Sequence, residues 1–183
     1  MMKFNATQCV QRIKAGDVRA FSEIVAHYNK MVFTLVIKII DNREDAEDIT
    51  QEIFLKVFKS LEQFKEESEF STWLYRIAYN TTLSEIRKRK LIFVPIEEYW
   101  ASEEGDCDEI DALSKEDKFR LLDKALKRLP PDEALLITLF YLNDRTIDEI
   151  SKITSLSVPN IKVKLHRIRK KLVATINQLM QDE

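Results

Sequence analysis

The sequence predicts an all-α protein built from two small helical domains that are joined by an acidic linker. Its 183 residues include only two glycines and four prolines, and 45% of its residues are hydrophobic. Apolar residues recur at helical spacing along most of the chain. The exception is the segment 91–114, which carries eight acidic and no basic residues. The composition therefore favours helices, and the acidic segment marks the boundary between two blocks.

The first predicted domain covers residues 1–90 and has the pattern of consecutive helices. Thr7 can cap a first short helix that ends at Gly16, and Asp17 can cap a second one. The apolar stretch Met31–Ile40 predicts a further, mostly buried helical segment. The apolar residues of the second helix fall at helical spacing: Ala20, Phe21, Ile24, Val25 and Tyr28.

The next predicted helix is capped by Asn42, with Asp45 in the capping-box position three residues later. Its apolar residues step by three or four along one face: Ala46, Ile49, Ile53 and Val57. A second apolar set points to another face: Phe54, Phe58 and Leu61. Glu62–Phe70 loses this periodicity and predicts a loop, and Ser71–Lys90 predicts a helix that ends in four consecutive basic residues.

The second predicted domain covers residues 115–183. The linker that precedes it, residues 91–114, lacks sustained periodicity, although a short ordered segment fits Ile92–Tyr99. A helix is expected from about Ser114 to Leu129, where a pair of prolines stops it. Another is expected from about Asp132 to Leu142.

A helix-turn-helix is predicted after these two helices. Thr146 and Glu149 stand in capping-box positions and open a short helix. Thr154–Leu156 forms the turn, and Ser157 can cap a second helix that continues to Leu172. A proline in the first turn of that helix is tolerated, because no intrahelical donor is needed there.

The second helix of this motif carries an apolar and a polar stripe about 100° apart. The apolar stripe consists of Ile161, Leu165, Ile168 and Leu172, and the polar stripe of Asn160, Lys164, Arg167 and Lys171. Six basic and no acidic residues occur within Ser157–Leu172. Such a helix suits the major groove of DNA, where cations neutralise phosphates and Asn160 can reach base edges. The same pattern also fits an ordinary surface helix with a solvated basic face.

The sequence offers little support for an enzyme. The chain contains only two histidines, and it has no glycine-rich phosphate loop and no nucleophile motif. Cys9 and Cys107 lie far apart and form no metal-ligand spacing, so we expect no metal, cofactor or small-molecule substrate. The N-terminus is too polar for a signal peptide, and Met31–Ile40 is too short for a membrane span. We therefore expect a cytoplasmic protein without membrane insertion.

Four stretches of the chain resemble parts of one known family in the same order. GDVRAFSEIVAHYNKMVF, DNREDAEDITQEIFLKVFKSL and FSTWLYRIAYNTTLSEIRKR resemble region 2 of the extracytoplasmic-function (ECF) sigma factors, and TIDEISKITSLSVPNIKVKLHRIRKKL resembles region 4. The resemblance covers nearly the whole chain. It implies a protein that binds core RNA polymerase, recognises the −35 and −10 promoter elements and helps to melt DNA. It also implies an anti-sigma partner.

The resemblance assigns roles to particular side chains of the first domain. The helix from Asp45 to Phe58 resembles the part that grips the coiled coil of the largest polymerase subunit, through Asp48, Gln51, Glu52 and Phe54. Glu62–Phe70 resembles the loop that captures a flipped base of the −10 element. The implied −10 residues are Phe64, Trp73, Tyr75, Arg76, Asn80 and Arg87. Aromatic faces and cations suit an opened strand. The alternatives are that Phe54 and Phe58 pack inside the domain and that Trp73 is a core residue.

In the second domain the resemblance implies that the basic helix reads the −35 element. The implied contacts are Ser157, Asn160, Lys162, Lys164, Arg167 and Lys171. The family often has glycine in the helix-turn-helix turn, where a left-handed backbone is wanted, and this chain has Ser155. The preceding turn also lacks its usual glycine, but Asn143 and Asp144 tolerate that conformation.

Two other classes of function remain as alternatives. One is a regulator that binds an operator as a dimer without polymerase, which would need a ligand or receiver domain that the sequence does not show. The other is a pure interaction module. Transcription in vitro separates the three, because only a sigma factor directs core polymerase to start at a promoter.

Overall fold

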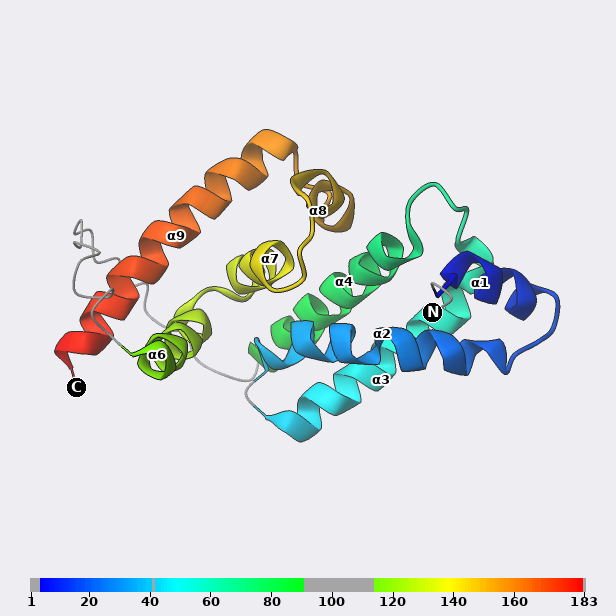
Figure 1. Cartoon of the computed structure of the whole chain (residues 1–183), viewed down its shortest axis with the longest axis horizontal. Coiled ribbons are helices and arrows are strands. Elements are labelled where there is room, and N and C mark those ends of the chain that lie inside the picture. Colours follow the sequence, from blue (N-terminus) through cyan, green and yellow to red (C-terminus); the bar gives the residue numbers. More distant parts are fainter. Residues whose placement is uncertain (1–3, 41, 91–113, 183) are drawn as a thin grey trace.

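The computed structural model describes residues 4–40, 42–90 and 114–182, and within these ranges all regular secondary structure is helical (Figure 1). The predicted all-α class is therefore confirmed. Apart from Ser114, the predicted linker lies outside the described residues, as does the segment Ile92–Tyr99. The helices form two groups, one before and one after this linker.

The N-terminal group consists of α1 (Ala6–Lys14), α2 (Ala20–Ile37), α3 (Arg43–Ser60), the 3₁₀-helix η1 (Leu61–Gln63) and α4 (Phe70–Lys90). The helix predicted after Asn42 and the helix predicted near Ser71 are confirmed. The predicted loop is shorter than expected, because η1 occupies its first residues. The apolar stretch that was expected to stay helical to Ile40 leaves the helix at Ile37.

Two of the predicted helix caps in this group are wrong. Asn5, not Thr7, caps α1, and its side chain accepts a hydrogen bond from the amide of Gln8 at 3.1 Å. Asp17 does not cap α2, because the helix begins at Ala20 and Arg19 stands in the cap position. The Asp17 carboxylate instead accepts hydrogen bonds from Arg12 at 2.7 and 3.0 Å.

The cap of α3 is as predicted, but the capping box is not. The Asn42 side chain accepts hydrogen bonds from the amides of Glu44 and Asp45 at 2.8 and 3.3 Å. The Asp45 carboxylate turns instead to Arg89, whose guanidinium donates to it at 2.5 Å. This hydrogen bond lowers the pKa of Asp45. It also ties the beginning of α3 to the end of α4.

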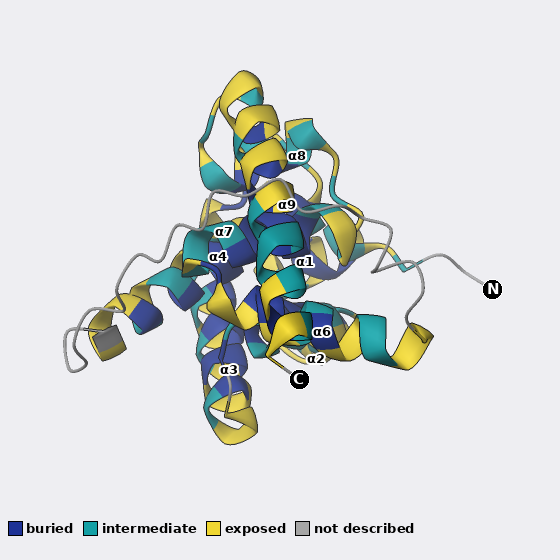
Figure 2. Ribbon diagram, turned by 90° about the vertical axis from the view of Figure 1, so that its left-hand side faces the viewer, coloured by how far each residue is buried: buried dark blue, intermediate teal, exposed yellow. Residues whose placement is uncertain are grey.

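The core of the N-terminal group lies where α2, α3 and α4 meet (Figure 2). The predicted apolar face of α3 is buried along its length, which confirms it: Ala46, Ile49, Ile53 and Val57. Side chains on the neighbouring helices α2 and α4 are also fully enclosed: Ile24, Leu35 and Leu74. Burial of these side chains is the main stabilising contribution to this half of the chain.

The C-terminal group consists of α6 (Lys115–Arg128), α7 (Pro131–Tyr141), α8 (Ile147–Thr154) and α9 (Val158–Gln181). Ser114 caps α6, since its hydroxyl accepts a hydrogen bond from the amide of Asp117 at 3.1 Å. Pro131 occupies the first turn of α7, where a missing amide hydrogen costs nothing. α6, α7 and α8 agree with the predicted helices to within a residue or two at each end, whereas α9 continues nine residues past the predicted end at Leu172.

The two groups of helices pack directly against each other. α8 packs on α4, and α7 contacts both α4 and α2. An ion pair joins the end of α2 to α6, with Lys38 Nζ at 2.7 Å from Asp123 Oδ1. The hydrogen bond from Lys38 lowers the pKa of Asp123. The structure therefore holds both halves of the chain in one closed arrangement.

Candidate nucleic-acid interface

The predicted capping box at the start of α8 is present. The Glu149 amide donates to Thr146 Oγ1 at 3.2 Å, and the Thr146 amide donates to Glu149 Oε2 at 2.8 Å. Burial raises the pKa of Glu149, but the hydrogen bonds from Thr146 and the ion pair with Arg145 outweigh it, so the pKa lies below its usual value. The short first helix of the motif is thus fixed at its N-terminus.

The turn between α8 and α9 is left-handed at Ser155, where φ is 61° and ψ is 18°. This confirms the expectation that a residue other than glycine carries the strained position. Neighbouring polar groups hold it in place: the Ser155 amide donates to the Ser151 carbonyl at 2.8 Å, and Ser151 Oγ donates to the Leu156 carbonyl at 2.6 Å. Asp144 in the preceding turn also has a positive φ, 50°, as the sequence allowed.

Ser155→Gly should raise the free energy of unfolding by about 1 kcal/mol, because glycine adopts this conformation without the Cβ clash that serine suffers. Thermal or urea unfolding of the purified chain measures the change. Ser84→Gly is the matched control, since Ser84 lies exposed within α4. There the same exchange should lower the free energy of unfolding by about 0.5 kcal/mol, because glycine is a poorer helix former than serine. A loss of stability in both variants would refute strain at Ser155.

The apolar stripe predicted for α9 is buried against the other helices of its group, which confirms the orientation of this helix. Its members are Ile161, Leu165, Ile168 and Leu172. Ser157 stands in the cap position, but its side chain makes no capping hydrogen bond. The rest of the first three turns faces outward. α9 therefore presents its basic side away from the core.

The six side chains predicted to contact the −35 element fall into two sets. Four are exposed on α9: Ser157, Asn160, Lys162 and Arg167. The other two are half-buried and paired with the beginning of α7. Lys164 lies 3.3 Å from Asp132, and Lys171 lies 2.7 Å from Glu133. Their role in DNA binding stays a prediction.

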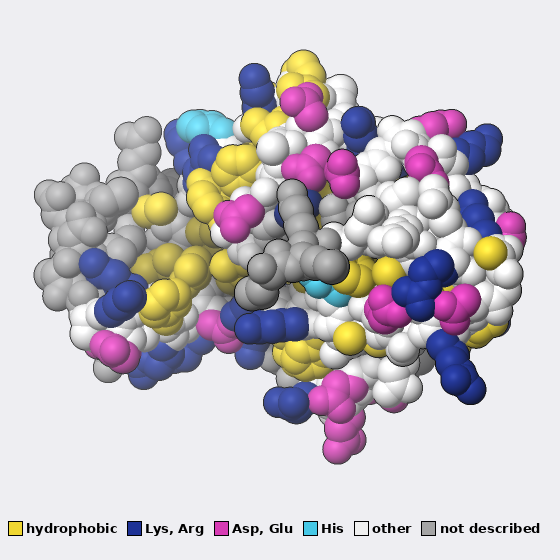
Figure 3. All heavy atoms as spheres, turned by 45° about the vertical axis from the view of Figure 1, so that its right-hand side comes forward, with side chains coloured by type: hydrophobic (Ala, Val, Ile, Leu, Met, Phe, Trp, Pro, Cys, Tyr) yellow, Lys and Arg dark blue, Asp and Glu magenta, His cyan; other side chains and the backbone are white. Residues whose placement is uncertain are grey.

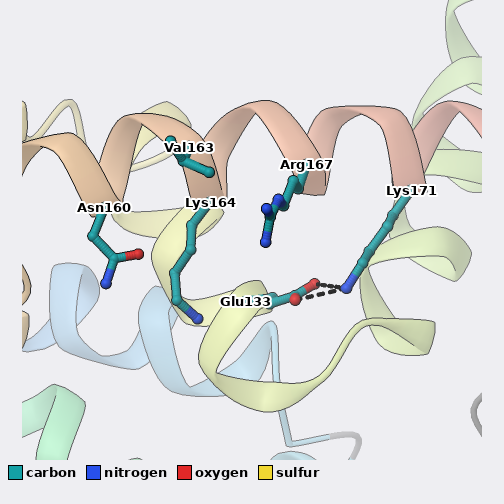
Figure 4. Close-up of a pocket in the computed structure, with 6 residues that line it drawn as sticks. All are labelled: Glu133, Asn160, Val163, Lys164, Arg167 and Lys171. Carbon is teal, nitrogen blue, oxygen red and sulfur yellow. Dashed lines mark hydrogen bonds and ion pairs between the residues drawn. The ribbon is translucent and has the colours of Figure 1, made fainter.

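Four of these residues line one hollow of about 400 Å³ (Figure 4). Asn160, Lys164, Arg167 and Lys171 line it from α9, together with Val163, and Glu133 lines it from α7. Among the described residues, Arg167 has no hydrogen-bonding or ion-pairing partner, so its guanidinium is available to a ligand. The sequence analysis did not single out Val163, which is 49% exposed and adds an apolar side chain to this surface.

The predicted −10 residues are also divided. Arg76, Asn80 and Arg87 are exposed on α4, and Trp73 is half-buried beside them. Tyr75 is fully buried. Trp73, Arg76, Asn80 and Arg87, spaced three, four and seven residues apart, thus lie along one outward-facing side of α4. Their contact with DNA stays a prediction.

Aromatic rings form a floor beneath the loop that follows η1. Phe64 is buried, with its ring centroid 5.4 Å from that of Phe70 and 5.2 Å from that of Trp73. Lys14 of α1 donates a hydrogen bond to the Phe64 carbonyl at 3.1 Å. The segment Lys65–Glu69 above this floor is mostly exposed. Phe64 therefore anchors the loop, and Trp73 is partly a core residue.

The predicted polymerase-binding residues occupy α3. Asp48 and Gln51 are exposed, and Glu52 is half-exposed in an ion pair with Lys56 at 2.7 Å. Phe54 is buried, and its ring centroid lies 6.5 Å from that of Phe21. This agrees with the alternative that Phe54 packs inside the domain and does not contact polymerase.

Leu55 takes the place on the exposed face of α3 that Phe54 was predicted to fill. It is 60% exposed and lies three, four and seven residues after Glu52, Gln51 and Asp48, so all four side chains share one face. Phe58 is 38% exposed at the end of this face. Leu55 was not among the residues predicted from the sequence, although its spacing from the acidic residues was the signal that could have identified it.

The structure also reveals an aromatic contact between the two halves that the sequence did not suggest. The guanidinium of Arg145, which precedes α8, lies over the ring of Tyr75 in α4 at 5.4 Å from its centroid. Arg145 Nη1 lies 2.9 Å from Glu149 Oε1 and 3.5 Å from Ser71 Oγ. Burial raises the pKa of Tyr75. One of the predicted −10 residues thus lies beneath the helix-turn-helix.

The described part of the chain was also searched for a metal site and for a membrane-spanning helix. It contains no group of three or more His, Cys, Asp or Glu side chains arranged to hold a metal. None of its helices is both long and apolar enough to cross a bilayer. Acidic and basic side chains are interspersed over the face shown in Figure 3. The exposed side of α9 stands out against this mixed surface because its first three turns carry no acid.

Comparison with known proteins identifies two family regions. Residues 24–92 match the family described as Sigma-70 region 2, and residues 119–172 match Sigma-70, region 4. The chain is 32% identical over 180 residues to the ECF RNA polymerase sigma factor SigW of Bacillus subtilis, covering 93% of this chain and 96% of that protein. It is 30% identical over 181 residues to the ECF RNA polymerase sigma-E factor of Haemophilus influenzae, covering 93% and 95%.

Two solved structures share the fold. CnrH in complex with the cytosolic domain of CnrY aligns with a TM-score of 0.67 and 20% identity, over 93% of this chain and 96% of that one. The sigma factor RpoE of Bartonella quintana, in complex with the anti-sigma factor NepR, aligns with a TM-score of 0.64 and 21% identity, over 86% and 96%. At these identities the likeness concerns the arrangement of the helices.

Proposed function

Because this chain belongs to the ECF sigma factors, which are transcription initiation factors and not enzymes, we propose that three of its surfaces divide the work of initiation. One surface on α9 binds the −35 element, one on α4 and the preceding loop binds the −10 element, and one on α3 binds core RNA polymerase. The two DNA-binding units are the domains expected at residues 1–90 and 115–183, with the acidic segment 91–114 between them.

The observation that carries the −35 assignment is the exposed, acid-free side of α9. Lys162 and Arg167 project from it without acidic partners among the described residues, so they can neutralise phosphates. Asn160 lies one turn before Lys164 and can offer its amide to a base edge. The buried stripe beneath them keeps the helix at a fixed angle to α8, as a helix-turn-helix requires.

The −10 assignment is supported by a different arrangement on α4. Arg76, Asn80 and Arg87 follow one another along an exposed face, and Trp73 offers part of its ring next to them. Cations along a strand's backbone and an aromatic face for stacking are the groups that hold single-stranded DNA. The exposed loop Lys65–Glu69 lies at the beginning of this face, where a flipped base can enter.

Each DNA-binding surface is small and binds weakly alone, but the two surfaces together can select a promoter. Core polymerase holds both domains on one surface, so binding of the first promoter element raises the effective concentration of the second domain at its own element. Both similar structures are complexes with a second protein, the cytosolic domain of CnrY in one and the anti-sigma factor NepR in the other. We propose an anti-sigma partner for this chain as well, and the cytoplasm, where polymerase acts, as its location.

The test is transcription in vitro. Core polymerase from the source bacterium, fragments of its genomic DNA and the purified chain should yield transcripts whose 5′ ends share upstream −35 and −10 sequences. Core polymerase alone should not yield them. If the chain binds those DNA fragments tightly by itself but never directs initiation, it is an operator-binding regulator and the proposal fails.

Lys162→Met should weaken binding of the holoenzyme to −35 duplexes of different sequence to a similar extent. It should also reduce the slope of log K against log[salt] by about one, because one phosphate contact and its counterion release are lost. Affinities measured by fluorescence anisotropy over a range of salt concentrations give this slope. Lys30→Met is the charge-matched control, since Lys30 is exposed on α2, away from α9. An unchanged slope for Lys162→Met would remove Lys162 from the interface.

A further inference from the structure

Lys14 lies in the last turn of α1 and reaches across to the end of η1. Its ammonium group donates hydrogen bonds to the carbonyl of Phe64 at 3.1 Å and to the carbonyl of Glu62 at 3.5 Å. Carbonyls at the end of a helix lack intrahelical donors and carry the negative end of its dipole, so a cation is favourable there on both counts. Lys14 thus joins α1 to the residue at which the proposed −10 loop begins.

The helix that carries Lys14 is held mainly by α2 and not by the loop. Val10 on its inner face is 1% exposed. Arg12, two residues before Lys14, binds Glu23 of α2 at 2.9 Å. The helix ends at Gly16, whose φ of 103° is a conformation that glycine adopts readily. Lys14 therefore extends to the loop from a support that does not depend on the loop's own conformation.

The loop of residues 65–69 has few other contacts that define its shape. It is mostly exposed, and Glu66 within it has a left-handed φ of 61°, which is unfavourable for a residue other than glycine. Hydrogen bonds hold the loop at its two ends. Lys14 binds the Phe64 carbonyl at one end, and two amides in the first turn of α4 donate to the Glu69 carbonyl at 3.0 and 3.2 Å at the other.

The charge of this loop makes its shape important for DNA. Three of its five residues are glutamates and one is a lysine, so the loop as a whole does not attract phosphate. Contacts to bases, not to phosphates, distinguish one sequence from another. Such contacts discriminate well only when the groups that make them are held in place before binding. The contribution of the loop to promoter choice therefore depends on where its backbone is fixed.

We propose that Lys14 is a positioning residue for −10 recognition: it fixes the start of the loop and thereby sets how strictly the loop distinguishes the base that it accepts. The inference rests on the proposed function of this loop. Lys14 acts through the backbone at Phe64 and contacts no base itself. Its loss should leave the other surfaces of the factor intact and relax the choice among bases.

The first measurement needs neither polymerase nor DNA. Lys14→Met removes the ammonium group and keeps the length of the side chain. Hydrogen exchange of the Phe64 amide, which donates to the Leu61 carbonyl at 3.1 Å, is followed by NMR in the full chain. In Lys14→Met it should become about 3- to 10-fold faster, the range expected when one partly exposed hydrogen bond is lost. Lys30→Met is the matched control, because Lys30 is exposed on α2 and should leave this exchange unchanged.

The second measurement uses holoenzyme formed from core polymerase and each variant. A promoter recovered by transcription in vitro is compared with copies in which each −10 base is replaced in turn. Lys14→Met should lower the ratio of initiation rates between the original and a substituted promoter by about 3- to 10-fold at one −10 position. Affinities for core polymerase and for the −35 duplex should not change. Lys14→Arg should restore most of the ratio, since a guanidinium also donates to carbonyls.

The two measurements together decide the inference. Parent-like exchange in Lys14→Met would show that Lys14 does not position the loop. Faster exchange with an unchanged ratio would also overturn the inference, because the order of the loop would then not govern the choice of base. A parent chain that fails to initiate, or that initiates equally well from every substituted promoter, refutes the proposed function of the loop and the inference with it, whatever the exchange shows.

Discussion

Leu55→Asp should lower the affinity of the chain for core RNA polymerase by about 30-fold or more, the effect expected of a central apolar contact worth at least about 2 kcal/mol. Leu55 is 60% exposed and lies next to Gln51 and Glu52 on the face that also carries Asp48, so a partner that binds these polar groups also covers Leu55. A carboxylate there would be buried without a partner in the complex. Competition against a labelled reference sigma factor for core polymerase measures the loss.

The control for this substitution is Asn29→Asp, which adds the same charge at an exposed position on α2. It should leave polymerase affinity unchanged. The far-UV circular dichroism and unfolding temperature of Leu55→Asp should match those of the parent chain, because the side chain contributes little to the core. Normal polymerase binding by Leu55→Asp, together with a large loss for Phe54→Ala in a folded chain, would restore the original assignment of Phe54.

Ile161→Ala should lower the free energy of unfolding of the C-terminal domain by about 2–5 kcal/mol, the usual cost of a cavity left by a large buried aliphatic side chain. Ile161 is fully enclosed where the first turn of α9 meets the helices beneath it. The free energy of unfolding of a small domain is only a few kcal/mol. The substitution should therefore unfold much of the domain, and −35 binding should be lost with it. Polymerase binding through α3 should persist, because α3 packs mainly on α2 and α4.

Val163→Ala provides the comparison on the same helix. Val163 is 49% exposed, and truncating it should change the stability by less than about 0.5 kcal/mol. Urea unfolding followed by circular dichroism separates the two cases. Equal losses for both variants would mean that α9 is oriented differently, with the stripe that contains Ile161 no more buried than the outer face.

Much of this architecture could be predicted from the sequence because the determining interactions are local. The Thr146–Glu149 capping box, the left-handed Ser155 and the buried stripe of α9 depend on residues a few positions apart. The caps expected at Thr7 and Asp17 were wrong because each helix starts at a different residue from the one predicted: Asn5 caps α1, and α2 begins after Arg19.

The candidate surfaces were harder to predict, because they depend on contacts between distant segments. Phe54 and Leu55 are adjacent and both apolar, and Phe54 is the one that packs against Phe21 of α2. The cover over Tyr75 depends on the packing of α8 on α4, some seventy residues apart in the chain. Periodicity within one helix indicates which residues share a face, but not which distant segment covers that face.

The aromatic floor formed by Phe64, Phe70 and Trp73 has a consequence for how such a factor can change during evolution. Because these rings and the Lys14 hydrogen bond hold the two ends of the loop, the exposed residues Lys65–Glu69 contribute little to the stability of the fold. Substitutions there can alter which base is accepted without first destabilising the protein. The loop is therefore a separable module, through which a duplicated copy of the gene could acquire a new set of promoters.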